Sequence, residues 1–507
     1  MAKSLNDPGS PSLADEKHFS NYDGQAVDGG ESTPDGDNLD DPAAKRKLLM
    51  KLDLRVLPIF AVLWFLTFID RVNIANAKVQ GMEKSLNMKG NDFNVALVVF
   101  FATFIAFEVP FNMALGAKLK WLTPGYFLGA QCLILAMFTI GQGLVETKEA
   151  LVVMRMFVGL FEAGIVPGSI LIMSNYYPRY NLQWRMSLLA VANALASAFG
   201  GLIAYGIIDM DGDLGKKSWR WVFIIEGSVT AIFSVLGMLL IVDWPEKQSF
   251  LTAEETRLMK HLIAKDCNKS AKMDVLNKDA VIRCITDWKI WINVFIYIGT
   301  VCVTYSINLF GPTIIAGLNP KFTPKDILLR TAPVFLVSAV FCLASAWISD
   351  KLKHRSGVVI TGYLISLVGF CIFLTGNGVV TQGVRYMAIY FVSVGTFISL
   401  PVLWSLMANN VSGVYKVAFA SSMQIGLGSA GGIVASFAYQ TKDAPLYHNG
   451  HYFILSLMLM ALVCVVAFDA GLFFEMKARK EGKRDDRLTS PEVDNMGDDH
   501  PHFVFTY

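Results

Sequence analysis

Charged side chains stand inside apolar stretches of this sequence that are long enough to cross a bilayer. Residues 151–173 form one such stretch, since a spanning helix takes about 20 residues at a rise of about 1.5 Å each. The stretch nevertheless contains Arg155 and Glu162, and a charge near the bilayer centre costs on the order of 3 kcal/mol or more. Their spacing is close to two helical turns, so both side chains share one helix face. We expect this face to meet a protein interior or a water-filled path.

Further charges are expected inside the neighbouring apolar segments of the first half: Asp70, Arg71, Glu108 and Glu226. A carboxylate that is withdrawn from water can take up and release a proton near neutral pH, which is the physical basis of proton coupling. We expect Glu162 to be the leading proton carrier, with the other three carboxylates as further candidates. The helix directions put Arg71 and Arg155 at a similar depth, where the two could flank one anion, and they put Glu162 deeper.

Each of these residues also has a purely structural interpretation. Asp70 and Arg71 could mark the end of a helix, with the arginine reaching the lipid headgroups. Arg155 and Glu162 could form a buried network. Glu108 could satisfy backbone groups freed by a nearby proline, and the carboxylate at position 226 could belong to an interfacial belt of tryptophans. The residue types leave both interpretations open.

The second half offers hydroxyl, amide and aromatic groups where the first half has charges. The candidates for substrate contact are Tyr297, Tyr305, Asn308, Trp404 and Gln424. Each of them alone is more simply explained by a hydrogen bond between helices. As a set they predict a cavity wall that selects the substrate by shape, opposite a charged wall in the first half.

The composition is that of a membrane protein. Hydrophobic residues make up 53% of the 507 residues and charged residues only 17%, and long apolar runs recur throughout. The formal net charge of +2 gives no indication of nucleic-acid binding. The seven cysteines show no CxxC pair and no spacing typical of a metal site, and no nucleophile–base set is present. We therefore expect no enzyme activity, no cofactor and no metal.

Twelve apolar spans predict an all-α membrane protein with twelve transmembrane helices in two six-helix bundles. The spans are about 56–75, 93–116, 123–145, 150–174, 186–208, 220–242, 288–310, 329–349, 357–376, 384–408, 416–439 and 452–475. The expected parts are a disordered tail (1–48), a first bundle (49–242), a linker loop (243–287), a second bundle (288–476) and a tail (477–507). In the linker, Thr252 and Glu255 have the spacing of a capping box at the start of a short helix.

Basic residues indicate the orientation of the chain. Five Lys and Arg lie between positions 45 and 55, and five more follow the last span between positions 477 and 484. Such residues favour the cytoplasmic side, so both termini are expected there, although several lysines would then face outward. We expect a multi-pass protein of the plasma membrane. The glycosylation sequons at Asn268 and Asn410 then lie on the cytoplasmic side, where glycosylation does not occur.

Five motifs together resemble the major facilitator superfamily of transporters. They are IDRVNIANA (69–77), FEVPFN (107–112), RMFVGLFEAGIVPG (155–168), WRWVFIIEG (219–227) and DAPLY with a following glycine (443–450). More narrowly, they are similar to the allantoate permease-like branch of the fungal anion:cation symporters. The resemblance covers about residues 45–480 and implies two bundles that alternate access to a central site.

The resemblance also implies roles for particular residues. In related organic-anion symporters, residues matching Arg71, Arg155 and Glu162 take part in substrate binding and proton coupling. The superfamily's basic loop motif is degraded between the second and third spans. Between the eighth and ninth spans it survives as Asp350, Lys351 and Arg355, which are the expected gating-loop residues.

The leading hypothesis is a proton-coupled symporter, expected to be a monomer, that imports a small organic anion such as a carboxylate vitamin or a ureide. Paired arginines with a buried carboxylate nearby favour it. An exporter of a fungal secondary metabolite is the alternative, because the same scaffold can work in the outward direction. A nutrient sensor that binds without transporting is a third hypothesis, against which the modest tails argue.

Overall fold

The computed structural model describes residues 41–116, 123–268, 278–352, 354–375, 381–412, 414–440, 443–444, 446–489, 496–501 and 503–506. Residues Met1–Arg46 form one unit, and most of the tail expected at 1–48 lies outside the described residues. Residues Lys47–Tyr507 form a second compact unit, which contains the features discussed below. The described residues of this second unit are helical with short connections and contain no strand.

The first half of this unit holds six long helical stretches, after α1 (Pro42–Arg55), which begins in the first unit. They are α2 (Leu57–Val79), α4 (Asp92–Gly116), α5 (Pro124–Leu144), α6 (Lys148–Glu162) continued by α7 (Ile165–Tyr176), α8 (Arg179–Ile207) and α9 (Ser218–Leu240). The four-residue helix α3 (Met82–Ser85) lies between α2 and α4. These helices match the six predicted spans, although α8 begins several residues earlier than expected.

The second half repeats this pattern. It holds α12 (Trp288–Leu318), α13 (Pro324–Leu352), α14 (Arg355–Leu374), α15 (Gln382–Asn410), α16 (Val414–Gly428) continued by α17 (Ala430–Ala438), and α18 (His448–Lys480). Eleven helical stretches of the described residues are long and apolar enough to cross a membrane. The remaining predicted span, 416–439, corresponds to α16 and α17 together, which Ser429 separates.

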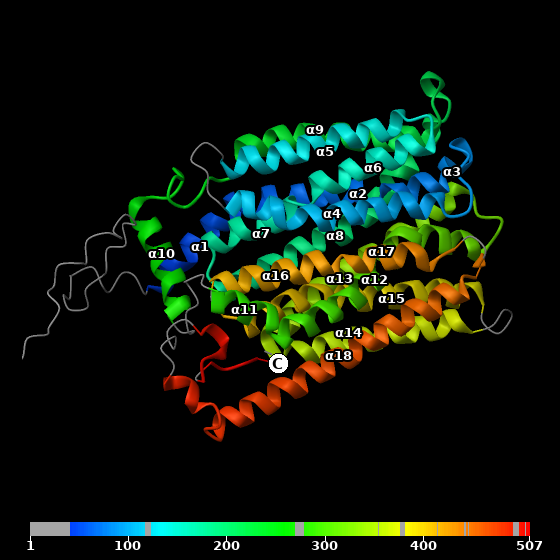
Figure 1. Cartoon of the computed structure of the whole chain (residues 1–507). Helices are drawn as coiled ribbons and strands as arrows, with labels where there is room; N and C mark the ends of the chain where they lie inside the picture. The colour runs from blue at the N-terminus through cyan, green and yellow to red at the C-terminus, as the bar shows by residue number, and fades with distance from the viewer. Residues whose placement is uncertain are drawn as a thin grey trace, which may run out of the picture. The chain divides into compact units, whose positions relative to one another are not determined.

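Two short helices occupy the predicted linker between the halves: α10 (Ala253–Asn268) and α11 (Lys278–Thr286). The capping box is confirmed, because the Glu255 amide donates to Thr252 Oγ1 (3.2 Å) and the Thr252 amide donates to Glu255 Oε2 (2.9 Å). In Figure 1 the long helices run alongside one another, with α10 and α11 at one end and α3 at the other. We call these ends the linker end and the opposite end.

Glycine allows α6 to approach α4 closely. A Cβ atom at Gly159 would lie 2.2 Å from the carbonyl oxygen of Phe100, well inside contact distance. At the same crossing, the Thr103 hydroxyl donates to the carbonyl of Met156 at 2.9 Å. The small residue at position 159 therefore lets the two helices pack closely, as small residues do between membrane helices.

The fourth and eleventh spans are each broken in the middle. Helix α6 ends at Glu162 and α7 starts at Ile165, with Pro167 in its first turn, where a missing backbone N–H is tolerated. The second break separates α16 from α17 at Ser429. Irregular backbone at membrane depth is tolerated where it is buried in protein or lines a cavity. Both breaks border the central cavity described below, and they bring Glu162 and Ser429 to its wall.

The two halves meet through α8 packed on α13, α2 on α12, and α4 on α16 and α17. Several of these contacts close the opposite end. Lys325, in the first turn of α13, pairs with Asp209, which follows α8. Phe93 of α4 meets Phe310 of α12 edge to face with 6.3 Å between ring centroids, and Lys78 lies over the Phe93 ring at 4.1 Å.

Candidate functional site

An ion pair between Arg71 and Glu162 lies at the centre of the helical unit. Arg71 stands on α2, and its Nη2 and Nε atoms donate to Glu162 Oε1 at 2.5 and 2.8 Å. Its Nη1 atom donates to the hydroxyl of Tyr305 on α12. Glu162 is fully buried and Arg71 is 7% exposed. One guanidinium thus joins a carboxylate of its own half to a hydroxyl of the other half.

Aromatic rings surround the Arg71 guanidinium. Its central carbon lies 4.8 Å from the ring centroid of Phe104 and 5.5 Å from those of Phe68 and Phe100. Positive charge is attracted to the faces of such rings, and the rings exclude water. The side chain is therefore held in place by contacts on several sides.

The ion pair borders a small central cavity between the halves. The volume of this cavity that is open to the centre of a water molecule is about 60 Å³, so the cavity has room for a few water molecules. Seventeen residues from both halves form its wall: Trp64, Thr67, Phe68, Arg71, Phe104, Glu162, Val166, Asn193, Tyr297, Val301, Thr304, Tyr305, Phe397, Leu400, Trp404, Ile425 and Ser429. Of the predicted site residues, the cavity brings together Arg71, Glu162, Tyr297, Tyr305 and Trp404.

Tyr297 and Trp404 form part of the wall contributed by the second half. The indole N–H of Trp404 on α15 donates to the hydroxyl of Tyr297 on α12 at 3.1 Å. Trp404 also meets Trp64 of α2 edge to face, with 6.0 Å between ring centroids. Trp64 is not among the residues predicted for the site. It lies seven residues before Arg71 on the same helix face, and that spacing could have revealed it.

Arg155 lies away from this cavity, inside the first bundle. Its side chain is fully buried and is absent from the cavity wall. Its Nη1 atom donates to the backbone carbonyl of Arg71 at 3.4 Å, and its guanidinium lies 5.7 Å from the Phe223 ring of α9. The two arginines therefore meet through the backbone of α2, and in this structure they do not face one another across the cavity as expected.

The other three candidate carboxylates are buried in different surroundings. Asp70 lies among Thr230, Glu162 and Arg155 in the first bundle. Glu226 on α9 is 4% exposed, and no described residue hydrogen-bonds its carboxylate.

Glu108 on α4 faces the second half. A Cβ atom at Gly426 of α16 would lie 3.3 Å from its Oε2 atom, and neither of its carboxylate oxygens has a hydrogen-bond partner among the described residues. None of these three carboxylates lines the cavity.

Asn308 and Gln424 make contacts between helices instead of lining the cavity. Ser197 of α8 donates to Asn308 Oδ1 at 3.2 Å, which links the two halves. The Gln424 side-chain amide donates to the backbone carbonyl of Leu403 at 3.3 Å. These contacts fit the structural interpretation that the sequence left open for both residues.

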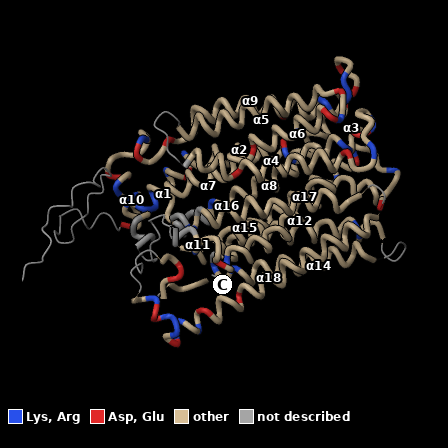
Figure 2. Tube along the Cα trace, viewed as in Figure 1, with Lys and Arg blue, Asp and Glu red and all other residues tan. Residues whose placement is uncertain are grey.

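The predicted gating-loop residues lie at the linker end, around the connection from α13 to α14. Arg355 starts α14, and its Nη1 atom donates to the carbonyl of Ser405 on α15 at 3.0 Å. Lys351 is exposed, with its ammonium 5.0 Å from the ring of Trp347. The side chain of Asp350 lies outside what the structure describes. In Figure 2 most charged residues gather at the ends of the helices, which sets the buried charges of the first half apart.

Known transporters resemble the chain over most of its length. Residues 60–436 match the family model of the Major Facilitator Superfamily. An uncharacterized transporter of Schizosaccharomyces pombe is 30% identical over 449 residues, covering 88% of this chain and 87% of that protein. The high-affinity nicotinic acid transporter of Saccharomyces cerevisiae is 28% identical, covering 94% of this chain and 88% of that protein. The MFS-type transporter cnsO of Penicillium expansum is 28% identical, covering 92% of each.

A solved structure shares the fold. A bacterial homolog of the human lysosomal transporter Spinster, in an inward-facing and occupied conformation, aligns with a TM-score of 0.57. The identity is 15%, covering 85% of this chain and 96% of that chain. The helical architecture, the family match and the transporter relatives agree. The chain belongs to the Major Facilitator Superfamily and is a membrane transporter rather than an enzyme.

Proposed function

We propose that this transporter is a proton-coupled symporter of a small organic anion. The observation that carries the proposal is the Arg71 guanidinium, held between Glu162 and Tyr305 in the wall of a cavity between the two halves. Arginine suits a carboxylate, because its planar N–H groups match the two oxygens. The aromatic wall suits a substrate with an apolar body. One relative is named for nicotinic acid, which combines an acid group with an aromatic ring.

Competition for Arg71 couples the anion to a proton. While Glu162 is ionised it neutralises Arg71, so an incoming anion would leave one negative charge uncompensated in a buried site. A proton that binds to the Glu162 carboxylate removes this charge and frees the guanidinium for the anion. Anion and proton therefore bind together and leave together, and the ion pair forms again in the empty transporter. Asp70, Glu108 and Glu226 are further proton-carrying groups in this proposal.

The same proposal includes the orientation and the conformational state. With both termini and the linker end on the cytoplasmic side of the plasma membrane, the closed end with Asp209 and Lys325 faces outward. The structure then corresponds to a state with its outer gate shut. We also place the chain in the allantoate permease-like branch of the anion:cation symporters, on the motifs around Arg71 and Glu162.

Uptake into proteoliposomes tests this function. Purified protein is offered a panel of labelled small organic anions, beginning with pyridine-3-carboxylate, with and without an acidic exterior. We expect the gradient to drive accumulation of at least one anion by about tenfold for one pH unit, the limit for one proton per anion. Glu162→Gln should still exchange anion across the membrane but should not concentrate it. Arg71→Ala should do neither.

Glu149→Gln is the matched control, because Glu149 is exposed in the first turn of the same helix as Glu162. It should behave like the unaltered protein. The proposal fails if accumulation ignores the pH gradient, or if Glu162→Gln concentrates the anion as well as the control does.

A further inference from the structure

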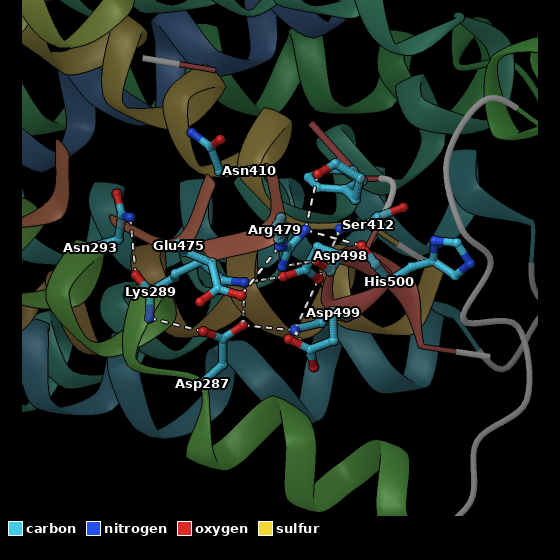
Figure 3. Close-up of polar contacts among 12 residues, drawn as sticks. Asp287, Lys289, Asn293, Asn410, Ser412, Glu475, Arg479, Asp498, Asp499 and His500 are labelled. Atoms are coloured by element: carbon cyan, nitrogen blue, oxygen red, sulfur yellow. Dashed lines mark hydrogen bonds and ion pairs between the residues drawn. The ribbon is translucent and has the colours of Figure 1, made fainter. Parts of the chain in front are cut away.

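A second cluster of buried charges lies outside the cavity wall, at the linker end of the second bundle. Lys289 lies in the first turn of α12 and is 4% exposed, and Lys416 near the start of α16 is fully buried. The Lys416 ammonium lies 2.7 Å from Asp287 Oδ2 and 2.9 Å from Asp498 Oδ1. Lys289 pairs with the same two carboxylates, at 3.3 Å for Asp287. Figure 3 shows several residues of this cluster converging from different helices.

Asp498 belongs to the last described stretch of the chain, residues 496–501 and 503–506, which we call the C-terminal segment. Arg479 of α18 anchors it by donating to the backbone carbonyls of Asp498, His500 and Phe503, each at 3.0 Å. The Asn410 side chain of α15 donates to the carbonyl of Thr506 (2.8 Å) and accepts from its amide (2.9 Å). The segment thus contacts four helices through named polar groups, as Figure 3 shows for several of them.

An aromatic anchor accompanies the acidic one. Phe505 is only 3% exposed. The Lys289 ammonium lies 4.9 Å from its ring centroid and the Arg479 guanidinium 4.5 Å, both within the range of cation–π attraction. The neighbouring Val504 side chain is 68% exposed, so only one face of the segment packs against the helices.

The charges of this cluster balance only when the segment is in place. Two buried ammonium groups face Asp287 and Asp498, with Asp499 further away at 3.8 Å from Lys416. Without Asp498, the two buried ammonium groups would share Asp287, and one buried positive charge would stay uncompensated, which is strongly unfavourable. Burial by itself would raise the pKa of Asp498, but Lys289 and Lys416 outweigh it and hold that pKa below its usual value. The helix ends therefore have the chemistry of a carboxylate-binding site.

The helices tied together here also line the central cavity. Lys289 stands eight residues before Tyr297 on α12, about 12 Å along the axis. On α15, Asn410 follows Trp404 by six residues, and α16 contributes Ile425 to the cavity wall. One short segment thus fastens the ends of three cavity-lining helices.

We propose that the linker ends of α12, α15 and α16 form a second binding site, for a peptide with a carboxylate followed by a buried phenylalanine, and that the chain's own C-terminal segment occupies it as a latch. The latch holds the three helix ends in one arrangement. This inference does not depend on the transported substrate or on proton coupling.

Thiol labelling of the full chain in detergent tests the latch. Met496→Cys places a thiol at a 5% exposed position of the segment, and Val504→Cys places the matched control thiol at the exposed one. Both are treated with a maleimide, and labelling is read at each peptide by mass spectrometry. We expect Met496→Cys to react at least about tenfold more slowly than Val504→Cys. Adding Asp498→Asn should abolish most of this difference.

Charge balance provides a second measurement that a general loss of stability would not reproduce. Lys416→Met combined with Asp498→Asn restores one cation to one carboxylate. The combined variant should therefore protect Met496→Cys better than Asp498→Asn alone. Equal reactivity of Met496→Cys and Val504→Cys in the otherwise native chain would overturn the latch. So would a combined variant that protects less than Asp498→Asn does.

A labelled synthetic peptide of residues 496–507 examines the binding site directly. In the full chain with Asp498→Asn the site is weakly occupied, so the peptide should bind saturably, as fluorescence anisotropy reports. It should not bind the unaltered chain, whose own segment has the advantage of a high effective concentration. Absence of binding to the Asp498→Asn chain, while its size-exclusion profile stays monodisperse, would contradict the peptide site.

Discussion

Replacing Glu162 by glutamine tests how much the central ion pair contributes to stability and how much to transport. The amide keeps the shape of the side chain and removes its charge. Arg71 then remains 7% exposed beside Tyr305, and among the described residues no other carboxylate pairs with it. Loss of one partner from a buried pair costs about 3–5 kcal/mol, because the other charge stays buried without compensation.

The size of the effect on thermal unfolding follows from this cost. A unit of 150–250 residues, about the size of one six-helix half, changes its unfolding temperature by about 2–4 °C per kcal/mol. We therefore expect Glu162→Gln to lower the unfolding temperature in detergent by roughly 6–20 °C. Arg71→Met combined with Glu162→Gln removes both charges, so it should recover most of that loss.

Transport measurements separate the contribution of the ion pair to stability from its contribution to transport. The combined variant should be stable but unable to accumulate anion, because it lacks both the anion partner and the proton carrier. The exposed control Glu149→Gln should change neither measurement. If the combined variant unfolds no later than Glu162→Gln, the two side chains do not act as a pair. If it accumulates anion normally, the proposed binding role of Arg71 is wrong.

Three further predictions concern other parts of the chain. The pKa of Asp498 is lowered in the folded state. Its contribution to stability is therefore complete above the unfolded-state pKa of about 3.9, and it is lost only as the pH falls through the lower folded-state pKa. Protection of Met496→Cys, relative to an exposed control thiol, should therefore stay constant between about pH 5 and 8. Gly159→Ala should destabilise the fold by about 1–3 kcal/mol in thermal unfolding, since its Cβ would lie 2.2 Å from a carbonyl oxygen. Gly206→Ala should not, because its Cβ would meet no atom of the described residues within 4 Å. Lys325→Ala should leave the unfolding temperature unchanged, because its ion pair is exposed and screened by solvent.

The sequence predicted the helices and the important charges better than the directions in which the side chains point. Apolar run length decides where a helix can span, and this placed Arg71 and Glu162 on the correct helices. Helical period placed Arg155 and Glu162 on one face, but it could not tell that α2 lies between Arg155 and the cavity. That outcome depends on how helices pack, which no local pattern records.

The C-terminal segment was beyond sequence reasoning for a different reason. Its residues show neither helical nor strand period, and a tail was the natural expectation. Asp498 is held by Lys289 and Lys416, which stand 209 and 82 residues away in the chain. Burial of a lysine at a helix start is itself uninformative until its partner is known. Only the fold brings these charges together.

The two buried charge clusters differ in a way that suits different tasks. At the linker end, two lysines share two buried aspartates, so each cation keeps a partner if one contact breaks. At the cavity, Arg71 pairs with one carboxylate of the described residues, Glu162, which lies in the cavity wall. A shared arrangement resists opening, whereas a single pair beside a cavity can be exchanged for another anion once its carboxylate is neutralised.

We therefore expect the proton and substrate to act on the cavity pair while the latch stays closed. Measured thiol protection at Met496→Cys that is unchanged by a transported anion, together with altered transport by Glu162→Gln, would fit this division. Loss of protection on adding the anion would show instead that the latch opens during transport.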